Sequence, residues 1–426
     1  MKNAHFYGEF FKSSDVFYNG YLKTKNKQVN RMAKSRNLYI IYSILILVAF
    51  TFAVRSSNNA FMTTMPLFVE RYFHFTGTDV GLIAGFSSLI MFLATFFINS
   101  RLNANSRRYL FIFANVLITI SLLLIMYSTF FSIWLYVLFV SFSAGIIMPN
   151  IITSAGDYPD RKVRERMMGI YTLALSASLI VGPTLEGLVL DYLPLKYGFL
   201  LFAPISAIAV ILSPFMKFPE SKSEESKDVK VFSNPGFKVA IFSILTYNVP
   251  FSMIVYFSGI FAEHAFKMPY SVIMLLFSLL FAVSFISRVA LSYFVPSNLW
   301  RYIKFSMFMT AIGASVIFLS RDVLFYVIGI MLLGIPHGLT YPLSISSIGR
   351  SFDISKRNKA NSYFFAIIML INIVVPTAAG LLIDHIGFRT VMIFIVPIIL
   401  ILFVLARKEV KLIRLDKVRL SKLPWQ

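Results

Sequence analysis

Three polar side chains stand in the middle of a long apolar stretch near the start of the chain. The stretch runs from about residue 38 to 68, and Arg55, Asn58 and Asn59 lie close to its centre. Helix positions three and four apart share a face, so these side chains would form a polar wedge roughly 100° wide. The guanidinium keeps its charge at any physiological pH. The wedge could therefore hold a polar or negative group of a ligand.

The same residues also have a purely structural interpretation. A buried arginine can bond to backbone carbonyls or to a neighbouring helix, and single asparagines often make hydrogen bonds between helices. A second arginine, Arg288, lies near the end of another apolar stretch, where its side chain is expected to reach toward the membrane surface.

Glu186 is the only acidic residue deep inside an apolar stretch, here residues 167–190. Apolar surroundings favour the neutral form of a carboxyl group. A proton on Glu186 could then be exchanged during a coupled process. The alternative is that the side chain reaches water near the end of its segment, or pairs with another group.

Several kinds of chemistry lack the residues that they need. There is no G-x-x-x-x-G-K-[ST] loop for a nucleotide and no H-E-x-x-H motif, and the five histidines are scattered. The chain has no cysteine, which excludes disulfide and thiol chemistry. We therefore expect no enzyme activity, no metal site and no cofactor.

The elements that must position these residues are apolar runs of about 20 residues. The sequence is 58% hydrophobic and only 14% charged, against roughly a quarter charged in soluble domains. This composition predicts an all-α polytopic membrane protein. Twelve spans are expected within residues 38–68, 80–98, 109–127, 133–152, 167–190, 197–216, 239–262, 271–293, 303–319, 323–344, 362–383 and 391–405.

The basic residues that give the chain its net charge of +21 are unevenly distributed between the two sets of gaps. Of the 40 lysines and arginines, 33 lie in the termini and the even-numbered gaps between spans, and five lie in the opposite gaps. This is the positive-inside pattern, which puts both termini in the cytoplasm of a multi-pass cell-membrane protein and leaves nucleic-acid binding unsupported. The expected parts are a cytoplasmic tail (1–37), a six-helix half (38–216), a cytoplasmic linker (217–238), a second six-helix half (239–405) and a basic cytoplasmic tail (406–426).

The two halves are copies of one another. With a shift of 193 residues, 14 of the 47 positions in 145–191 are identical, whereas chance would give about three. The matches include Gly145/Gly338, Pro149/Pro342, Asp160/Asp353, Arg164/Arg357, Pro183/Pro376, Gly187/Gly380 and Asp191/Asp384. The same shift makes Asn248 the counterpart of Arg55, beside Tyr247.

Two parallel six-helix halves resemble the major facilitator transporters, and several motifs agree. The segment "NSRLNANSRR" keeps Arg107 and Arg108 of the family's loop between helices 2 and 3. Helix 4 keeps a Gly and a Pro, but Val140 and Ser141 stand where drug exporters carry an arginine. The helix 5 antiporter pattern appears as "SLIVGPTLEG", with Glu186 in place of a glycine. Together with "GIPHGLTYP" and "VVPTAAGLLIDHIG", these segments resemble the sugar and drug efflux branch.

The resemblance implies a central cavity between helices 1, 4, 7 and 10. The expected substrate-binding residues are Arg55, Asn58, Asn59, Asn150, Tyr247, Asn248, His337 and Tyr341. Bends or close packing are expected at Gly182, Pro183, Gly187, Pro376 and Gly380. A cytoplasmic gate, with solvated loop charges as the alternative, is expected from Arg107, Arg108, Asp160, Arg164, Asp353 and Arg357. Arg55 would also pair with the carboxylate of Glu186 if the helices bring the two residues together.

The resulting function is a secondary active transporter of a small organic solute. The main hypothesis is a proton-coupled efflux permease for drugs or metabolites that works as a monomer in the lipid bilayer. One alternative is an importer or exchanger of organic anions that uses Arg55. Another is a sensor or scaffold with this fold that transports nothing.

Overall fold

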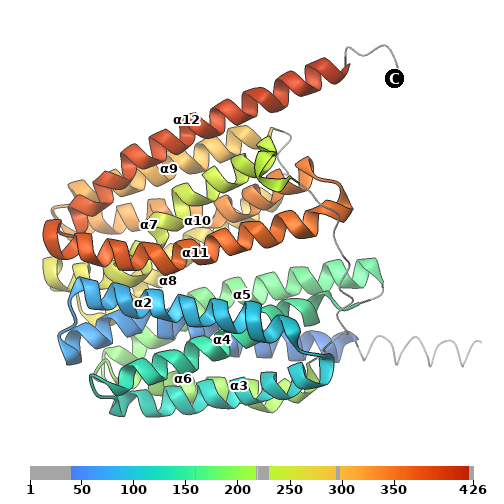
Figure 1. The fold of residues 1–426 in the computed structure, drawn as a ribbon. Coiled ribbons are helices and arrows are strands. Elements are labelled where there is room, and N and C mark those ends of the chain that lie inside the picture. Colours follow the sequence, from blue (N-terminus) through green and yellow to red (C-terminus); the bar gives the residue numbers. More distant parts are fainter. Residues whose placement is uncertain (1–39, 159, 217, 219–229, 294–297, 422–426) are drawn as a thin grey trace, which may run out of the picture.

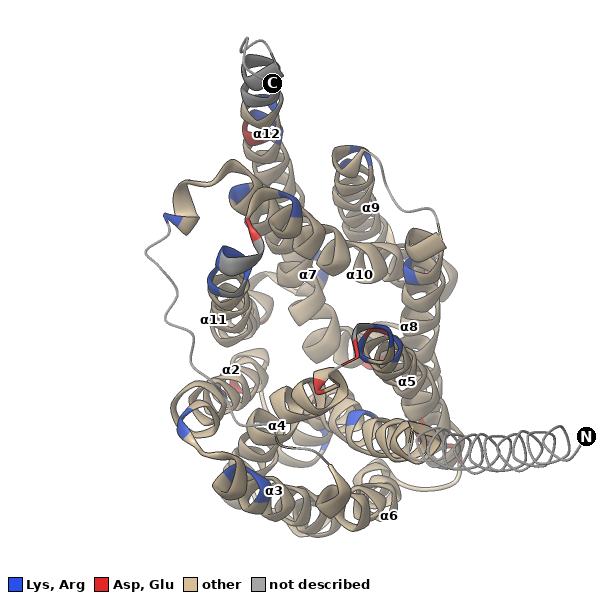
Figure 2. Ribbon diagram, turned by 90° about the vertical axis from the view of Figure 1, so that its right-hand side faces the viewer, with Lys and Arg blue, Asp and Glu red and all other residues tan. Residues whose placement is uncertain are grey.

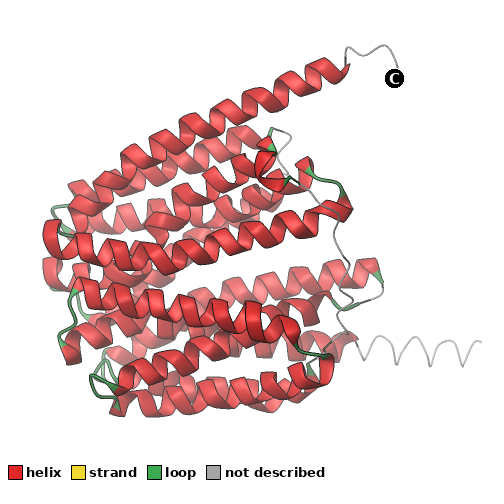
Figure 3. Cartoon of the chain, in the orientation of Figure 1, coloured by secondary structure: helices red, strands yellow, loops and turns green. Residues whose placement is uncertain are grey.

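The computed structural model describes residues 40–158, 160–216, 218, 230–293 and 298–421, which form helices joined by short loops (Figures 1 and 3). The first helix, Ile40–Phe73, has no label in Figure 1. The others are α2 (Gly77–Leu93), α3 (Ala104–Leu124), α4 (Ser132–Gly156), α5 (Arg161–Leu190), α6 (Tyr197–Leu212), α7 (Pro235–Phe266), α8 (Tyr270–Tyr293), α9 (Leu299–Leu319), α10 (Val323–Ser351), α11 (Ile354–Ile386) and α12 (Phe388–Ser421).

The twelve predicted spans are confirmed, because twelve helices in the described residues are long and apolar enough to cross a membrane. Two boundaries differ from the expected ones. Helix α7 begins at Pro235, inside the expected linker, and the side chain of Asn234 accepts the Phe237 amide at 3.0 Å as its N-cap. Helix α12 continues to Ser421, because residues 406–421 contain neither Gly nor Pro and many strong helix formers. The expected tail 1–37 and residues 219–229 of the linker lie outside the described residues.

The halves meet along two similar helix crossings, α2 against α11 and α5 against α8. Small residues allow the close approach. A Cβ on Gly77 of α2 would lie 3.0 Å from the carbonyl oxygen of Gly380 on α11, and one on Gly187 of α5 would lie 2.8 Å from that of Ser271 on α8. Gly187 and Gly380 are repeat-related, so the two crossings are built in the same way. Both helices run on through Pro183 and Pro376.

One group of bonds between the halves lies at the end of the bundle away from the C-terminus (Figure 1). There the carboxylate of Asp384, near the end of α11, accepts the backbone amides of Gly77 and Thr78 at 2.7 Å each. It also accepts the Thr78 hydroxyl at 2.6 Å. Nearby, His264 of α7 and Glu70 of the first helix lie 2.9 Å apart. An anion at a helix N-terminus is favoured by the helix dipole, so Asp384 helps to keep this end closed.

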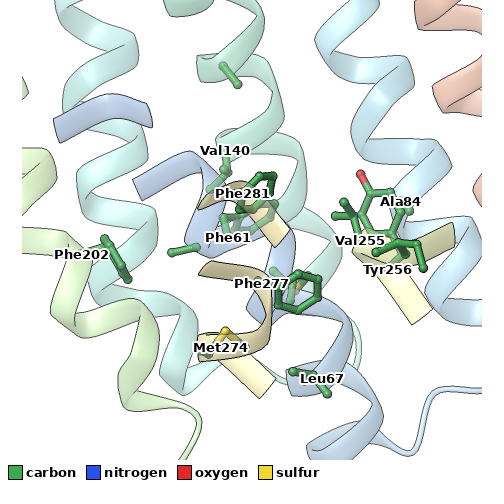
Figure 4. Close-up of a cluster of buried hydrophobic side chains, with 14 of the residues drawn as sticks. Phe61, Leu67, Ala84, Val140, Phe202, Val255, Tyr256, Met274, Phe277 and Phe281 are labelled. Atoms are coloured by element: carbon green, nitrogen blue, oxygen red, sulfur yellow. The ribbon is translucent and has the colours of Figure 1, made fainter. Parts of the chain in front are cut away.

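A buried apolar cluster also joins the two halves. Figure 4 shows Phe61 and Val140 from the first half beside Phe277 and Phe281 of α8, with Tyr256 of α7 also in view. These side chains belong to one continuous core. The bundle is therefore held by apolar packing as well as by the polar bonds around Asp384.

Replacing Asp384 by asparagine is expected to loosen this closed end. The change removes the charge and at least one acceptor, and a hydrogen bond to a charged group contributes about 1.5–3 kcal/mol. A cysteine placed at Ser87 in this cysteine-free chain should then react on the order of tenfold faster with a membrane-impermeant thiol reagent added on the side opposite the termini. Asp191→Asn is the matched control, because Asp191 is repeat-related to Asp384 and equally exposed, but its carboxylate makes no hydrogen bond or ion pair within the described residues. Equal labelling rates in both variants would contradict a closing role for Asp384.

Candidate substrate cavity between the halves

A cavity of about 210 Å³ lies between the two halves. Five helices line it: the first helix, α2, α4, α7 and α11. The lining side chains come from Arg55, Asn58, Phe61, Met62, Ser87, Ser88, Met91, Val140, Ser141, Ala144, Met148, Asn248, Phe251, Ser252, Val255, Tyr256 and Asn372. The expected set of helices 1, 4, 7 and 10 therefore needs a correction, because α2 and α11 line this cavity and α10 does not.

Among the described residues that line the cavity, Arg55 is the only one with a charged side chain. Its Nη2 donates to the hydroxyl of Tyr171 on α5 at 2.5 Å, and its Cζ lies 5.9 Å from the centre of that ring. Its Nε is buried and has no hydrogen-bond partner among the residues that the structure describes. None of the ion pairs in the described residues involves Arg55. The guanidinium thus has a neutral partner, an unused donor and no counter-charge.

The C-terminal half contributes a pair of amides to the cavity. Asn248 of α7 donates from Nδ2 to Oδ1 of Asn372 on α11 at 2.8 Å, and Ser252 donates to the Asn248 carbonyl at 3.0 Å. The repeat relates Asn248 to Arg55, and both side chains reach the same cavity. Asn58 adds a further amide, whose one hydrogen bond within the described residues is to the sulfur of Met62, at 3.6 Å.

The rest of the lining is mostly apolar. Methionines from three helices take part, together with Phe61 and Phe251. Flexible, polarizable methionines adapt to ligands of different shape. A polar group near Arg55 and an apolar group against the methionines would both find matching surfaces, so the cavity suits an amphiphilic solute.

Two of the predicted binding residues lie elsewhere in the N-terminal half. Asn150 of α4 is almost fully buried, and its Nδ2 donates to Oδ1 of Asn99 and to the carbonyl of Ile146, both at 2.7 Å. Asn59 is buried and does not belong to the cavity lining. Asn150 therefore takes the alternative role of an asparagine that links neighbouring helices.

Three more predicted residues form a layer behind the cavity. His337 of α10 packs against Phe251 with ring centres 4.5 Å apart and against Tyr247 at 5.6 Å, and its Nδ1 lies 2.7 Å from the hydroxyl of Ser284 on α8. Tyr341 lies one turn along α10 and is 39% exposed. None of the three lines the cavity. Phe251 does line it and packs against His337, so His337 can act on a ligand there only indirectly, by positioning Phe251.

Glu186 lies in a closed site inside the N-terminal half. Its side chain is fully buried, and Oε1 accepts a short hydrogen bond from Thr64 of the first helix. Gly198 of α6 leaves room for it, since a Cβ there would lie 2.6 Å from Oε1. The other oxygen, Oε2, is buried and has no hydrogen-bond partner in the described part of the chain. The helices do not bring Glu186 to Arg55, so the contact that was expected on that condition is not made: Glu186 bonds to Thr64 and Arg55 bonds to Tyr171.

The predicted gate residues make bonds within their own halves. Arg107 and Arg108 donate to the carbonyls of Leu102 at 2.9 Å and Pro214 at 3.0 Å. Asp160 caps its own helix through the Lys162 amide at 2.8 Å, and Arg164 is exposed.

The second set of gate residues behaves like the first. Asp353 lies 3.7 Å from Lys356, and Arg357 donates to the Phe352 carbonyl at 2.8 Å. Within the described residues, neither acid of the two sets has an ion pair with the opposite half.

Sequence reasoning missed four residues. Asn372 and Ser252 belong to the cavity, and an asparagine in the apolar run of α11 is the same kind of signal that singled out Arg55. Tyr171 carried no signal in the sequence. Arg288 was expected to reach the membrane surface, but its Nη1 contacts the hydroxyl of Ser176 on α5 at 3.3 Å. It therefore bridges the halves.

Solved structures with a similar fold are transporters. A bacterial homolog of the human lysosomal transporter Spinster, in an inward-facing and occupied conformation, matches with a TM-score of 0.69 and 12% identity over 87% of this chain and 96% of that one. A POT family transporter in complex with a thioalcohol-conjugated peptide matches with a TM-score of 0.72 and 12% identity over 88% and 96%. The human organic anion transporter MFSD10 matches with a TM-score of 0.62 and 13% identity over 86% and 99%. At these identities the likeness concerns the fold.

Sequence comparison gives the family. Multidrug resistance protein 2 of Bacillus subtilis (strain 168) is 22% identical over 249 residues, which are 55% of this chain and 60% of that protein. The alignment thus spans less than two thirds of that relative. The profile of the Major Facilitator Superfamily matches residues 44–321 and 298–422. This match covers nearly all of the helical bundle, and the chain therefore belongs to the Major Facilitator Superfamily of membrane transporters and is not an enzyme.

Proposed function

We propose that the protein exports a small, amphiphilic organic anion by alternating access, coupled to protons. The observation that carries the substrate class is the state of Arg55. It is a permanent cation at the cavity wall with an unused donor, and no acidic side chain lines the same cavity. A charge away from water is costly unless it is paired. A negative group of the solute would supply the missing partner.

The shape and chemistry of the cavity support a small solute. Its volume of about 210 Å³ is below the range of about 300–1,000 Å³ that is usual for drug-sized ligands. The amides of Asn58 and Asn248 can bond to further polar groups, while the methionine-rich wall accepts an apolar part. This combination favours a metabolite with one anionic end over a bulky lipophilic cation.

The direction of transport and its coupling to protons are supported by different observations. Export is favoured by the likeness to Multidrug resistance protein 2 and by the resemblance of helices 5, 10 and 11 to the efflux branch. Proton coupling is favoured by Glu186, a fully buried carboxyl with one unpartnered oxygen and no cation bonded to it. Ionisable groups enclosed in this way are typical of proton relays in transporters.

The test uses one carbon skeleton with three end groups. Hexanoate, hexanamide and hexylamine are offered to the purified protein in a thermal-shift assay and as competitors of flux in proteoliposomes, with and without a pH gradient. Hexanoate should stabilise the protein and compete most strongly, and the gradient should drive uphill movement. A preference for the amine would reject the anion. If no member of a wider set of carboxylates binds or moves, the inactive scaffold is the better hypothesis.

A further inference from the structure

A second cavity lies outside the transport path, between α9 and α12 at the end of the bundle where the C-terminus lies. It has a volume of about 710 Å³. Four cationic side chains line it: Arg301 and Lys304 from the start of α9, and Arg407 and Lys411 from the last part of α12. Figures 1 and 2 show α9 and α12 next to each other at the edge of the bundle, and Figure 2 marks Lys and Arg in blue near this end of both helices.

The helical repeat explains why these cations converge. On α9, Trp300, Lys304 and Phe308 recur every four residues and so share one face. On α12, Phe403, Arg407 and Lys411 repeat the same spacing. The two helices run in opposite directions and pack against each other. These two faces therefore meet, and the cations on both lie toward the same end of the bundle.

The four cations have no compensating acid in the described residues. None of them takes part in an ion pair. The acidic residue of α12 nearest to them, Glu409, points to α7, where it pairs with Lys238 at 3.1 Å. The cavity therefore collects four exposed positive charges at one place.

Aromatic side chains form an apolar floor in the cavity. Trp300 stacks on Phe403 with ring centres 5.7 Å apart, and Phe308 contacts Phe403 at 5.3 Å. Beyond this floor the outer surface of both helices is apolar, with Ile312 of α9 and Ile401 of α12 exposed. Tryptophan is favoured at the level of lipid headgroups.

We propose that this cavity binds the phosphate of an anionic phospholipid from the leaflet on the side of the termini. The phosphate would lie among Arg301, Lys304, Arg407 and Lys411, and an acyl chain would cover the aromatic floor and the apolar surface beyond it. Basic pockets between transmembrane helices are suited to such headgroups. A free phosphate could use the same cations but would leave the aromatic floor without a partner.

The experiment compares charge-matched variants of the full chain in neutral detergent. One variant carries Arg301→Gln, Lys304→Gln, Arg407→Gln and Lys411→Gln. The control carries Arg101→Gln, Lys162→Gln, Arg166→Gln and Lys408→Gln, which remove the same number of exposed arginines and lysines outside the cavity. Each protein is titrated with phosphatidylglycerol, with phosphatidylcholine of the same acyl chains, and with inorganic phosphate, and its melting temperature is followed.

Phosphatidylglycerol should stabilise the unmodified protein and the control more than phosphatidylcholine does. The cavity variant should bind it about 600-fold more weakly, because each of the four cations near an anionic lipid contributes about a factor of five. Equal responses of both variants would show that the basic face is only solvated. If inorganic phosphate stabilises the protein to the same extent as phosphatidylglycerol, the cavity binds a free anion and not a lipid. If the fourfold cavity variant does not fold, the pairs Arg301→Gln/Lys304→Gln and Arg407→Gln/Lys411→Gln give the same comparison.

Discussion

Replacing Arg55 by alanine is expected to weaken binding of an anionic substrate by about 10- to 100-fold, since a hydrogen bond to a charged group contributes about 1.5–3 kcal/mol. The protein should remain folded, because Arg55 has one neutral side-chain partner, Tyr171, and no ion pair in the described residues. Arg55→Lys keeps the charge but loses the planar fork, so its affinity should be intermediate. Affinity is measured by thermal shift and by competition of flux in proteoliposomes.

The variant Tyr171→Phe separates the two interpretations of Arg55. It removes the hydroxyl that accepts from Nη2 at 2.5 Å and keeps the ring. If Arg55 binds substrate, Tyr171→Phe should affect transport much less than Arg55→Ala. If the arginine serves only to hold α5 to the first helix, both changes should destabilise the protein to a similar degree. Normal transport by Arg55→Ala would remove Arg55 from the mechanism.

The fold could be predicted from the sequence because the membrane imposes simple rules. Backbone groups inside the bilayer must find their hydrogen-bond partners within the protein, so a long uncharged run is expected to cross the bilayer as a helix. The span ends were less predictable. Helix α12 runs on to Ser421 because the basic segment after residue 405 is itself a good helix former, and hydropathy cannot mark the end of such a helix.

The candidate site could be predicted only in part, because hydropathy does not fix how each helix is rotated. Asn150 and Asn248 look alike in sequence, yet one faces Asn99 inside its own half and the other faces the cavity. The repeat was the better guide, since it linked Asn248 to Arg55. His337 shows the opposite case, because Phe251 stands between it and the cavity.

The first helix connects the cavity to the enclosed carboxyl. It carries Arg55 at the cavity and Thr64 at the hydrogen bond to Glu186. These positions are nine residues apart, or about 13.5 Å along the helix axis. A shift of this helix would change both environments at once. Substrate and proton could then be coupled without touching one another.

Replacing Glu186 by glutamine is expected to abolish uphill transport driven by a pH gradient while substrate exchange stays within about twofold. Glutamine has nearly the same shape as a protonated glutamate and can still accept from Thr64, so the enclosed site should remain packed. It cannot release a proton, however, so a pH gradient could no longer drive transport through this residue. Uphill accumulation and counterflow are measured on the same proteoliposomes, and the melting temperature of the variant should match that of the unmodified protein.

Two further variants show whether the carboxyl itself carries the proton. Thr64→Val keeps Glu186 but removes its hydrogen-bond donor, so gradient-driven transport should persist. Asp191→Asn removes an exposed acid just after the same helix and should change nothing. Undiminished uphill transport by Glu186→Gln would exclude Glu186 as the coupling group. A joint loss of exchange and thermal stability would instead show that its role is to hold the first helix, α5 and α6 together.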